Sequence, residues 1–330
     1  MANVPRTGLA RQVAFGTANT SFTPVKLNDI GSTELQINKI ENDELFGGLD
    51  TFAPENGLRE AAISFGGRSY PAAVGYFLNM IAGDPVTTGA TNYTHTFVPS
   101  DDLPPAYTIG MAEPNGHDAY FRDVRASSLT LAQEEGDVLT FSIDGISSDR
   151  IMDTVSVGSV GLENRAFRYS DFTAFVQLGE GASAQYLNFK NFSITIDNPV
   201  SNIFTLNGED TAITQEFTGR RGVTFDAQLR FNAGDTRFLE AYEDNTPMEI
   251  VIEWAIDTNT SLMLTLPNVR ILSHEWSRGF DETVEDVSGA AYYDETLEGS
   301  VEMVLKNQVD SYVVAAPPGE GEGEGEGEGE

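Results

Sequence analysis

The sequence contains no cysteine. This absence excludes disulfide bonds, a thiolate nucleophile and cysteine-based zinc or iron–sulfur sites. It also contains no run of 18 apolar residues that could span a bilayer. The first eleven residues include two arginines and no apolar core, so we expect no secretory signal and a soluble product made in a cytoplasm. Stability must then come from apolar burial and main-chain hydrogen bonds.

Lysine is also scarce, at four of the 19 basic residues, against 51 acidic residues and a net charge of −32. A surface this acidic repels nucleic-acid phosphates and anionic membranes, which argues against specific DNA binding and membrane docking. Two origins of the charge remain open. One is a host that lives at high salt, where screening relieves self-repulsion; the other is an ordinary acidic protein from a GC-rich genome.

Motifs that carry catalysis are missing as well. There is no Gly-x-Ser-x-Gly nucleophile elbow, no phosphate-binding GxxxxGK[ST] loop and no HExxH zinc motif. The three histidines, His95, His117 and His274, lie in separate segments. His95 alternates with Tyr93 and Phe97 in a strand pattern, which favours a packed histidine over a catalytic base. We therefore predict no catalytic, cofactor or metal site.

One acidic cluster offers oxygen ligands for Ca²⁺: Asp281, Glu282, Glu285 and Asp286. It lacks the alternating DxDxDG register of a calcium loop, so a solvated acidic loop is the preferred interpretation. The pair of glycines at Gly179-Glu180-Gly181 opens no helical pattern and lacks a third glycine, which argues against dinucleotide binding.

Alternating apolar residues predict a mainly β fold. The alternation is clearest in Val223–Phe231 and Met248–Trp254, where every second side chain is apolar. Only two helices are predicted. One begins at Pro71, runs to Ile81 and stops at Gly83, and the other covers about residues 234 to 243. Both are short and amphipathic, so each should lie on a sheet.

The order of these elements occurs twice. The first series is Ala61–Phe65, helix, Tyr93–Phe97, Tyr107–Met111, Val124–Leu131 and Val138–Ile143; the second is Val223–Phe231, helix, Met248–Trp254, Leu262–Leu266, Val269–Trp276 and Val301–Leu305. One offset of 162 residues matches Ile63 with Phe225, Phe77 with Leu239 and Phe141 with Met303, and an offset of 159 matches Leu35-x-Ile37 with Ile194-x-Ile196.

This repetition predicts a tandem duplication. A chain of 330 residues fits two domains of roughly 150 residues. We place the first at residues 1–155, with an N-terminal arm, and the second at residues 156–316. Residues 317–330 form a flexible acidic Gly-Glu tail. Two long stretches, residues 38–57 and 198–221, exceed the usual length of a connection, which is typical of functional loops.

Four segments resemble the major tail tube proteins of long-tailed, siphovirus-like viruses: Leu187–Asn198, Gly219–Phe225, Leu264–Arg270 and Gly299–Leu305. Tyr93–Phe97, after the first helix, has a similar pattern. The resemblance covers about residues 25 to 306. It implies two tandem tail-tube-like β-sandwich or barrel domains, each with one short flanking helix, in a subunit that self-assembles into stacked rings.

In that family one domain per chain usually gives hexameric rings, so two domains per chain imply a trimer with pseudo-sixfold symmetry. The resemblance further implies a virion tail protein assembled in the host cytoplasm, without a cofactor, that meets the tape measure, tail terminator and distal tail proteins. Double-stranded DNA would pass through an acidic lumen without specific binding. The expected inter-ring contact residues are Asp43, Glu44, Leu45, Phe46, Asn202, Phe204 and Leu206. The Gly-Glu tail lies outside the family pattern, and its role stays open.

Two other functions compete with this one. A surface or virion β-sandwich adhesin that binds glycans or a receptor would have a signal peptide and exposed aromatic residues on its binding face. A hydrolase on a β scaffold would need the catalytic motifs that are missing.

Overall fold

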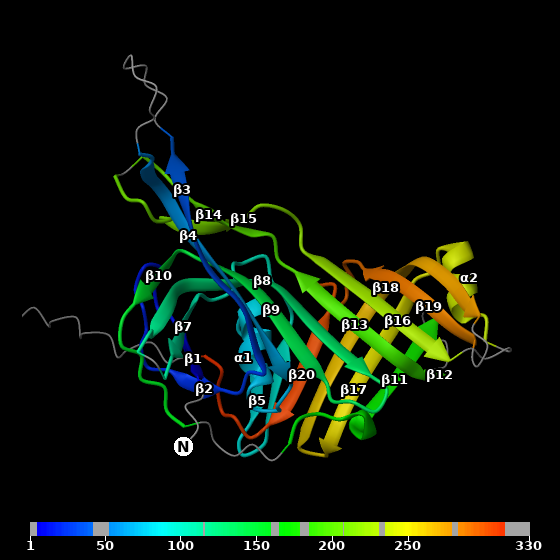
Figure 1. Ribbon diagram of the computed structural model, residues 1–330. Coiled ribbons are helices and arrows are strands. Elements are labelled where there is room, and N and C mark those ends of the chain that lie inside the picture. Colours follow the sequence, from blue (N-terminus) through cyan, green and yellow to red (C-terminus); the bar gives the residue numbers. More distant parts are fainter. Residues whose placement is uncertain are drawn as a thin grey trace, which may run out of the picture.

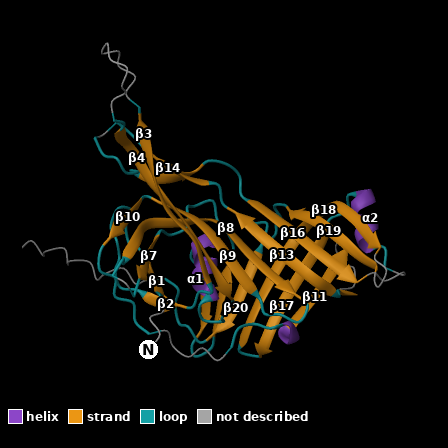
Figure 2. Ribbon diagram, viewed as in Figure 1, coloured by secondary structure: helices purple, strands orange, loops and turns teal. Residues whose placement is uncertain are grey.

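The computed structural model describes residues 5–41, 53–114, 116–159, 165–178, 185–206, 208–230, 235–278 and 283–313. Antiparallel strands dominate, with two short α-helices on their faces (Figure 1 and Figure 2). The predicted mainly β fold with two flanking helices is confirmed. No helix in the described ranges is long and apolar enough to cross a membrane.

The strands and helices follow one another along the chain in this order: β1 (Arg6–Arg11), β2 (Thr23–Val25), β3 (Asp29–Ile40), β4 (Glu55–Arg68), α1 (Val74–Ala82), β5 (Val86–Gly89), β6 (Tyr93–Phe97), β7 (Tyr107–Ala112), β8 (Ala119–Glu134), β9 (Thr140–Ser147), β10 (Asp149–Met152), a 3₁₀ turn η1 (Tyr169–Asp171), β11 (Phe172–Leu178), β12 (Gln185–Tyr186), β13 (Phe189–Asp197), β14 (Val200–Ile203), β15 (Thr214–Phe217), β16 (Gly222–Arg230), α2 (Arg237–Asp244), β17 (Met248–Asp257), β18 (Thr260–Arg278), β19 (Thr283–Ala291) and β20 (Glu302–Asn307).

The two longest strands, β8 and β18, organise the sheet. The first half of β8 lies between β7 and β10, and its second half lies between β9 and β13. The first half of β18 lies between β17 and β20, and its second half pairs with β19. A bulge interrupts each ladder at the same point, at Ser127 in β8 and at Leu272 in β18. Such bulges re-aim a strand. Each lies just inside the second ladder, because β9 begins to pair with β8 at Arg125 and β19 begins to pair with β18 at Val269.

The same order of strand pairing occurs twice. In one set β2–β1–β7–β8 and β3–β4–β9–β8 are hydrogen-bonded neighbours. In the other, β12–β11–β17–β18 and β13–β16–β19–β18 follow the same order. The helices also correspond, since α1 packs on β8 and α2 packs on β18. The β5–β6 hairpin after α1 has no counterpart between α2 and β17, where every residue is described.

Two glycines mark equivalent places in the two sets. A Cβ atom on Gly145 of β9 would lie 2.9 Å from the carbonyl oxygen of Arg125, and one on Gly289 of β19 would lie 2.8 Å from that of Arg270. Only glycine permits this close approach of backbones. Val124-Arg125 in β8 and Val269-Arg270 in β18 therefore occupy the same structural position.

The structure corrects several strand assignments. The segments Leu262–Leu266 and Val269–Trp276 were predicted as two strands, but β18 is continuous. Pro267 fits inside it because Pro267 and Asn268 together face one residue of β17, which makes a bulge. The strand β19 was not predicted, because its acidic residues suggested a loop.

These differences change which residues of the two series of strands correspond. Phe141 lies in β9, whose counterpart in pairing order is β19, so its match with Met303 of β20 is wrong. The match of Ile63 with Phe225 agrees with the structure, because Ile63 pairs with Gly145 and Phe225 pairs with Gly289.

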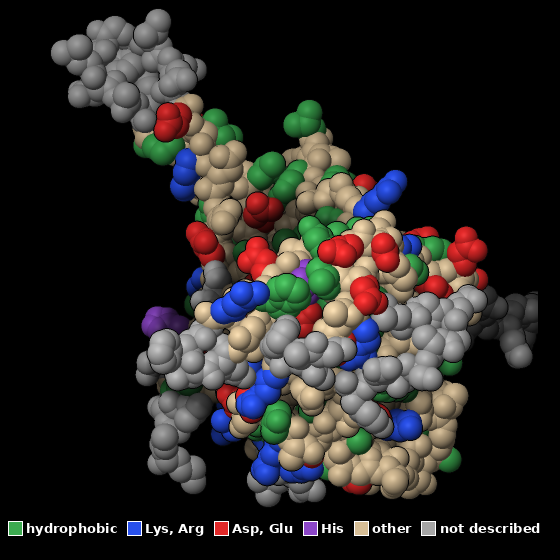
Figure 3. Space-filling view, turned by 90° about the vertical axis from the view of Figure 1, so that its right-hand side faces the viewer, with side chains coloured by type: hydrophobic (Ala, Val, Ile, Leu, Met, Phe, Trp, Pro, Cys, Tyr) green, Lys and Arg blue, Asp and Glu red, His purple; other side chains and the backbone are tan. Residues whose placement is uncertain are grey.

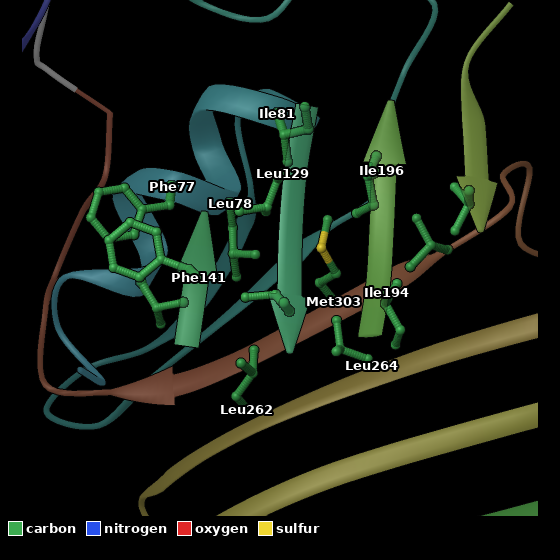
Figure 4. Packing of buried hydrophobic residues seen from close by; sticks show 14 of the residues in the cluster. Phe77, Leu78, Ile81, Leu129, Phe141, Ile194, Ile196, Leu262, Leu264 and Met303 are labelled. Atoms are coloured by element: carbon green, nitrogen blue, oxygen red, sulfur yellow. The ribbon is translucent and has the colours of Figure 1, made fainter. Parts of the chain in front are cut away.

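The apolar core is continuous from the first set of strands to the second (Figure 4). Phe77 of α1 stacks on Phe141 of β9 with ring centroids 4.0 Å apart, and Leu129 of β8 is buried beside them. The same cluster continues through Ile194 and Ile196 of β13. The helix stripe and the alternating strand residues predicted from the sequence thus meet in one core.

Candidate assembly surfaces

Two strand pairings connect the halves of the chain, β6 with β20 and β8 with β13, and the second of these joins the two sets of strands into a single sheet. We call it the internal seam: residues 128–134 of β8 run antiparallel to residues 191–197 of β13. On one face Leu131 lies opposite Ile194, and both are buried. On the other face the hydroxyls of Thr130 and Thr195 are 2.9 Å apart. The resulting neighbour order is β3–β4–β9–β8–β13–β16–β19–β18, and β3 and β18 lie toward opposite sides of the molecule (Figure 1).

The solvent side of this sheet is hydroxyl-rich and acidic. We call it the polar face, made of Glu34, Gln36, Ser64, Ser128, Thr130, Ser142, Asp144, Ser193, Thr195, Asp197, Thr224, Asp226, Gln228, Ser273, Glu275, Ser277, Asp286 and Ser288. Its members bond to one another across strands: Ser128 donates to Asp144 at 3.1 Å, and Gln228 and Ser277 donate to Asp286 at 2.8 and 2.6 Å.

Charge on the polar face is mainly negative. Six of its residues are Asp or Glu. The strand register also places three arginines on this side: Arg68 at the end of β4, Arg230 at the end of β16 and Arg270 on the edge strand β18. Arg230 pairs with Glu135 at 2.8 Å. Because carboxylates outnumber these arginines, the surface as a whole does not attract phosphate groups.

Both ends of the joined sheet are open edges. In the described part of the chain, β3 is paired on one edge, by β4, and β18 beyond Val269 is paired on one edge, by β19. A side chain contacts the first of these edges, since Arg150 Nη1 donates to the Thr33 carbonyl at 3.2 Å. Open edges carry main-chain groups that another strand can pair with.

Two hairpins project from the same side of the molecule, β3–β4 and β14–β15 (Figure 1). They support each other, because Asn202 Nδ2 donates to Glu60 Oε2 at 3.3 Å and the Arg59 amide donates to the Asp210 carbonyl at 2.8 Å. Four apolar side chains are exposed on these two hairpins: Ile40, Leu58, Leu206 and Ile213. Figure 3 shows hydrophobic side chains on the projecting part of the molecule at the top of the view.

The predicted inter-ring residues fall in these hairpins, with different surroundings. Asp43, Glu44, Leu45 and Phe46 lie outside the described residues. Asn202 sits near the base of β14–β15, where it also donates to the Ser147 carbonyl at 3.1 Å. Phe204 is half-buried. Leu206 is fully exposed, with an accessible fraction of 108%, so its environment best matches a contact residue.

Sequence reasoning missed a buried polar junction that holds the β14–β15 hairpin to the body. Asp123 of β8 is fully buried and has a φ of 58°, in the left-handed region. Its carboxylate accepts hydrogen bonds from the Gly16 amide at 2.7 Å and from the Ser148 hydroxyl. Its carbonyl accepts one from Gln215 Nε2 of β15 at 2.9 Å. The residue type Asp is tolerated at positive φ, but no other feature of the sequence indicates this role.

The three histidines occupy unrelated places. His95 is buried, as its strand pattern predicted; its Nε2 donates to the Val309 carbonyl at 2.9 Å, and its Nδ1 lies 2.9 Å from Thr87 Oγ1. Burial lowers the pKa of His95, partly offset by the bond to Val309. His117 is exposed. His274 of β18 contacts Glu285 of β19 at 2.6 Å.

The acidic cluster at 281–286 is not wholly a loop. Asp281 and Glu282 lie outside the described residues, whereas Glu285 and Asp286 belong to β19. Glu285 is buried against His274, and Asp286 accepts from Gln228 and Ser277. Within the described ranges no group of three or more His, Cys, Asp or Glu residues could hold a metal ion.

A mainly β chain with a joined sheet, open edges and projecting apolar hairpins has the features of a structural, self-assembling protein. A family model described as phage tail tube protein matches residues 6–310. The chain belongs to the phage tail tube protein family and is a structural subunit of a tail tube. The resemblance to major tail tube proteins is thereby confirmed, and the adhesin alternative is not favoured.

Two solved structures are similar to parts of the chain. One is titled "Virion of native gene transfer agent (GTA) particle", with 14% identity, a TM-score of 0.30, and coverage of 39% of this chain and 96% of that one. The other is the SPP1 tail tube, determined by solid-state NMR and cryo-EM, with 13% identity, a TM-score of 0.31, and coverage of 44% of this chain and 81% of that one. A comparison with curated proteins found no match.

Proposed function

We propose that three copies of this chain form a ring with pseudo-sixfold symmetry, and that the rings stack into a tube through which viral DNA passes. The observation that carries this proposal is the strand order that occurs twice in one chain, joined at the internal seam. Two similar units per chain, at residues 1–155 and 156–316, would fill alternate places in a ring of six units. The tube would be assembled in the host cytoplasm from subunits that need no cofactor.

The polar face is the surface we propose for the lumen. The helix α1 and the apolar core cover the opposite side of the joined sheet (Figure 4), so the polar face is the side left for solvent. Its six carboxylates repel the DNA backbone, and its hydroxyls hold water. A duplex could therefore slide along it without binding.

The projecting hairpins are the surface we propose for contact between rings. They extend on one side of the body and expose Ile40, Leu58, Leu206 and Ile213, which would be covered by the next ring. The expected contact residues of the first hairpin are Asp43, Glu44, Leu45 and Phe46, and those of the second are Asn202, Phe204 and Leu206. The tape measure, tail terminator and distal tail proteins would meet the lumen and the two ends of such a tube.

Electron microscopy of the purified protein tests this function. We expect rings or tubes about 100 Å wide, a width that several small domains around a DNA-sized hole would give. Class averages should show six units made by three chains. A ring of six full-length chains would contradict the trimer, and monomers at high concentration across all salt levels would contradict the tube.

A further inference from the structure

We infer that neighbouring chains in the ring are joined by antiparallel pairing of β18 of one copy with β3 of the next, in the register of the internal seam. The inference rests on the proposed ring and deepens it by naming the joint. Its basis is that the internal seam already shows how one unit of strands pairs with the next. If the chain holds two equivalent units, the same joint should recur between chains.

The first step identifies the strand equivalent to β8. Gly145 and Gly289 place Val124 of β8 and Val269 of β18 at corresponding positions. Each strand then has one extra residue, the bulge, before pairing resumes at Ser128 and Ser273. Counting on from the bulge, Thr130 corresponds to Glu275 and Leu131 corresponds to Trp276. The edge that β13 covers in β8 is the edge left open in β18.

The second step identifies the strand equivalent to β13. Ile194 of β13 pairs with Phe225, which pairs with Gly289. Thr33 of β3 pairs with Ile63, which pairs with Gly145. Thr33 therefore corresponds to Ile194. The sequence pattern matched Ile194 with Leu35 instead, two residues further along the chain. The edge that β8 covers in β13 is the edge left open in β3.

The register of the joint follows directly. The internal seam sets Ile194 opposite Leu131, Thr195 opposite Thr130 and Asp197 opposite Ser128. Between chains the corresponding pairs are Thr33–Trp276, Glu34–Glu275, Leu35–His274 and Gln36–Ser273.

The side chains of these pairs suit the joint. Trp276, whose accessible fraction is 43%, would be covered by Thr33 and Leu35, which are half-buried in the single chain. Glu34, Gln36, Ser273 and Glu275 are exposed and would extend the polar face across the joint. Each face of the sheet thus continues with the same character from one chain to the next.

The occupant of both edges is a second copy of this chain. The two edges lie toward opposite sides of the molecule (Figure 1), so the contact is head-to-tail, and head-to-tail contacts close into rings when the rotation permits. Figure 3 views the side toward which β18 lies and shows acidic, basic and hydrophobic side chains together there, which matches the mixed character of the joint.

One pair differs from its internal counterpart. Thr130 and Thr195 bond through their hydroxyls at 2.9 Å, whereas Glu34 and Glu275 would bring two carboxylates together. Like charges directly opposite each other destabilise a strand pair, and salt screens them. The joint between chains should therefore strengthen with salt, and the internal seam should not.

Disulfide trapping tests the joint without background, because the chain has no cysteine. Tubes are assembled from equal mixtures of two single variants, Glu34→Cys with Glu275→Cys, or Gln36→Cys with Ser273→Cys, and then oxidised. The off-register control mixes Gln36→Cys with Ser277→Cys, which shifts one strand by four residues, or about 13 Å, beyond disulfide reach. The double variant Thr130→Cys, Thr195→Cys is the internal control, and it should close within one chain.

We expect covalent dimers from the two in-register mixtures and few from the off-register mixture, with tubes still visible by microscopy. Tubes that form while neither in-register mixture cross-links would overturn the joint and leave the proposed ring standing. Wild-type protein that forms no rings would remove the proposed function, and the joint with it.

Discussion

Buried polar side chains tie distant segments of this chain together. His95 of β6 links the β5–β6 hairpin, through Thr87, to the segment after β20, through Val309. Asp123 links β8 to the N-terminal segment through Gly16. A buried polar group that loses its partner costs about 1–3 kcal/mol, so these few residues fix segments that apolar packing alone would hold less specifically.

Stability should depend on pH through His95. Burial lowers its pKa in the folded protein, whereas the unfolded chain takes up a proton near the ordinary value of about 6.5. The unfolded state therefore binds more protons as the pH falls through that value, and stability decreases. We expect a larger loss of melting temperature between about pH 7.5 and about pH 5.5 in the wild type than in His95→Gln. The exposed His117→Gln is the control and should behave as the wild type; equal losses in all three proteins would contradict this role.

Asp123→Ala should lower the free energy of unfolding by about 2–3 kcal/mol, because the Gly16 amide loses its acceptor, the Ser148 hydroxyl loses the nearer of its two acceptors and Arg122 loses an ion pair. Asp123→Asn should lose less, since its amide oxygen still accepts and Asn tolerates the positive φ. Denaturant titration measures both, with the exposed Asp102→Ala as a control. An Ala variant as stable as Asp102→Ala would show that the junction contributes nothing.

At the scale of elements, the length of a strand decides how many neighbours it can pair with and whether it extends beyond the body. β8 and β18 are long enough to pair with two sets of neighbours, one along each half of the strand. The hairpins β3–β4 and β14–β15 extend beyond the body and expose apolar residues. Exposed apolar groups on a projecting hairpin are typical of a contact surface.

Leu206→Asp should leave the subunit folded and shorten its tubes, because a charge replaces a fully exposed apolar side chain at the proposed contact between rings. Tube length measured by microscopy, with circular dichroism to check the fold, is the readout. Val86→Asp on β5, where Val86 is 70% exposed, is the matched control. Tubes of normal length from Leu206→Asp would remove the β14–β15 hairpin from the contact between rings.

Glu275→Thr copies the residue at the equivalent place in the internal seam, Thr130. Removing one of two opposed carboxylates should promote assembly at low salt, and the advantage over the wild type should vanish at molar salt. Light scattering across a salt series measures this, with Asp102→Thr as the control for a general change of charge. An equal gain from both variants would mean that Glu275 has no special place in the joint.

The charge of the whole molecule sets its response to salt. A net charge of −32 opposes compaction by self-repulsion, and ions screen that repulsion. We expect the melting temperature of the unassembled subunit to rise as NaCl increases to molar levels. A melting temperature that stays flat over that range would argue against a high-salt origin for the acidity.

Local patterns were enough for the fold class and for the two helices. Alternation of apolar residues reports which face of a strand is buried, and Pro71 and Gly83 bracket the first helix, although α1 itself begins at Val74. The burial of His95 and the repeated order of elements were visible in the same way, because each depends on neighbours in sequence. The strand β19 was not visible in this way, because its acidic residues have their partners on other strands. Glu285 contacts His274, and Asp286 accepts a hydrogen bond from Gln228.

The sequence by itself determined a mainly β chain with two short helices, an acidic surface, no cysteine and a repeated plan. Those properties follow from composition and from periods of two and 3.6 residues, which act within a few residues. Only the tertiary structure decided which strands correspond, that β8 pairs with β13, and that β3 and β18 keep open edges toward opposite sides. Strand pairing joins residues far apart in the chain, and many alternating strands have patterns similar enough to pair, so the choice among them depends on the whole packed fold.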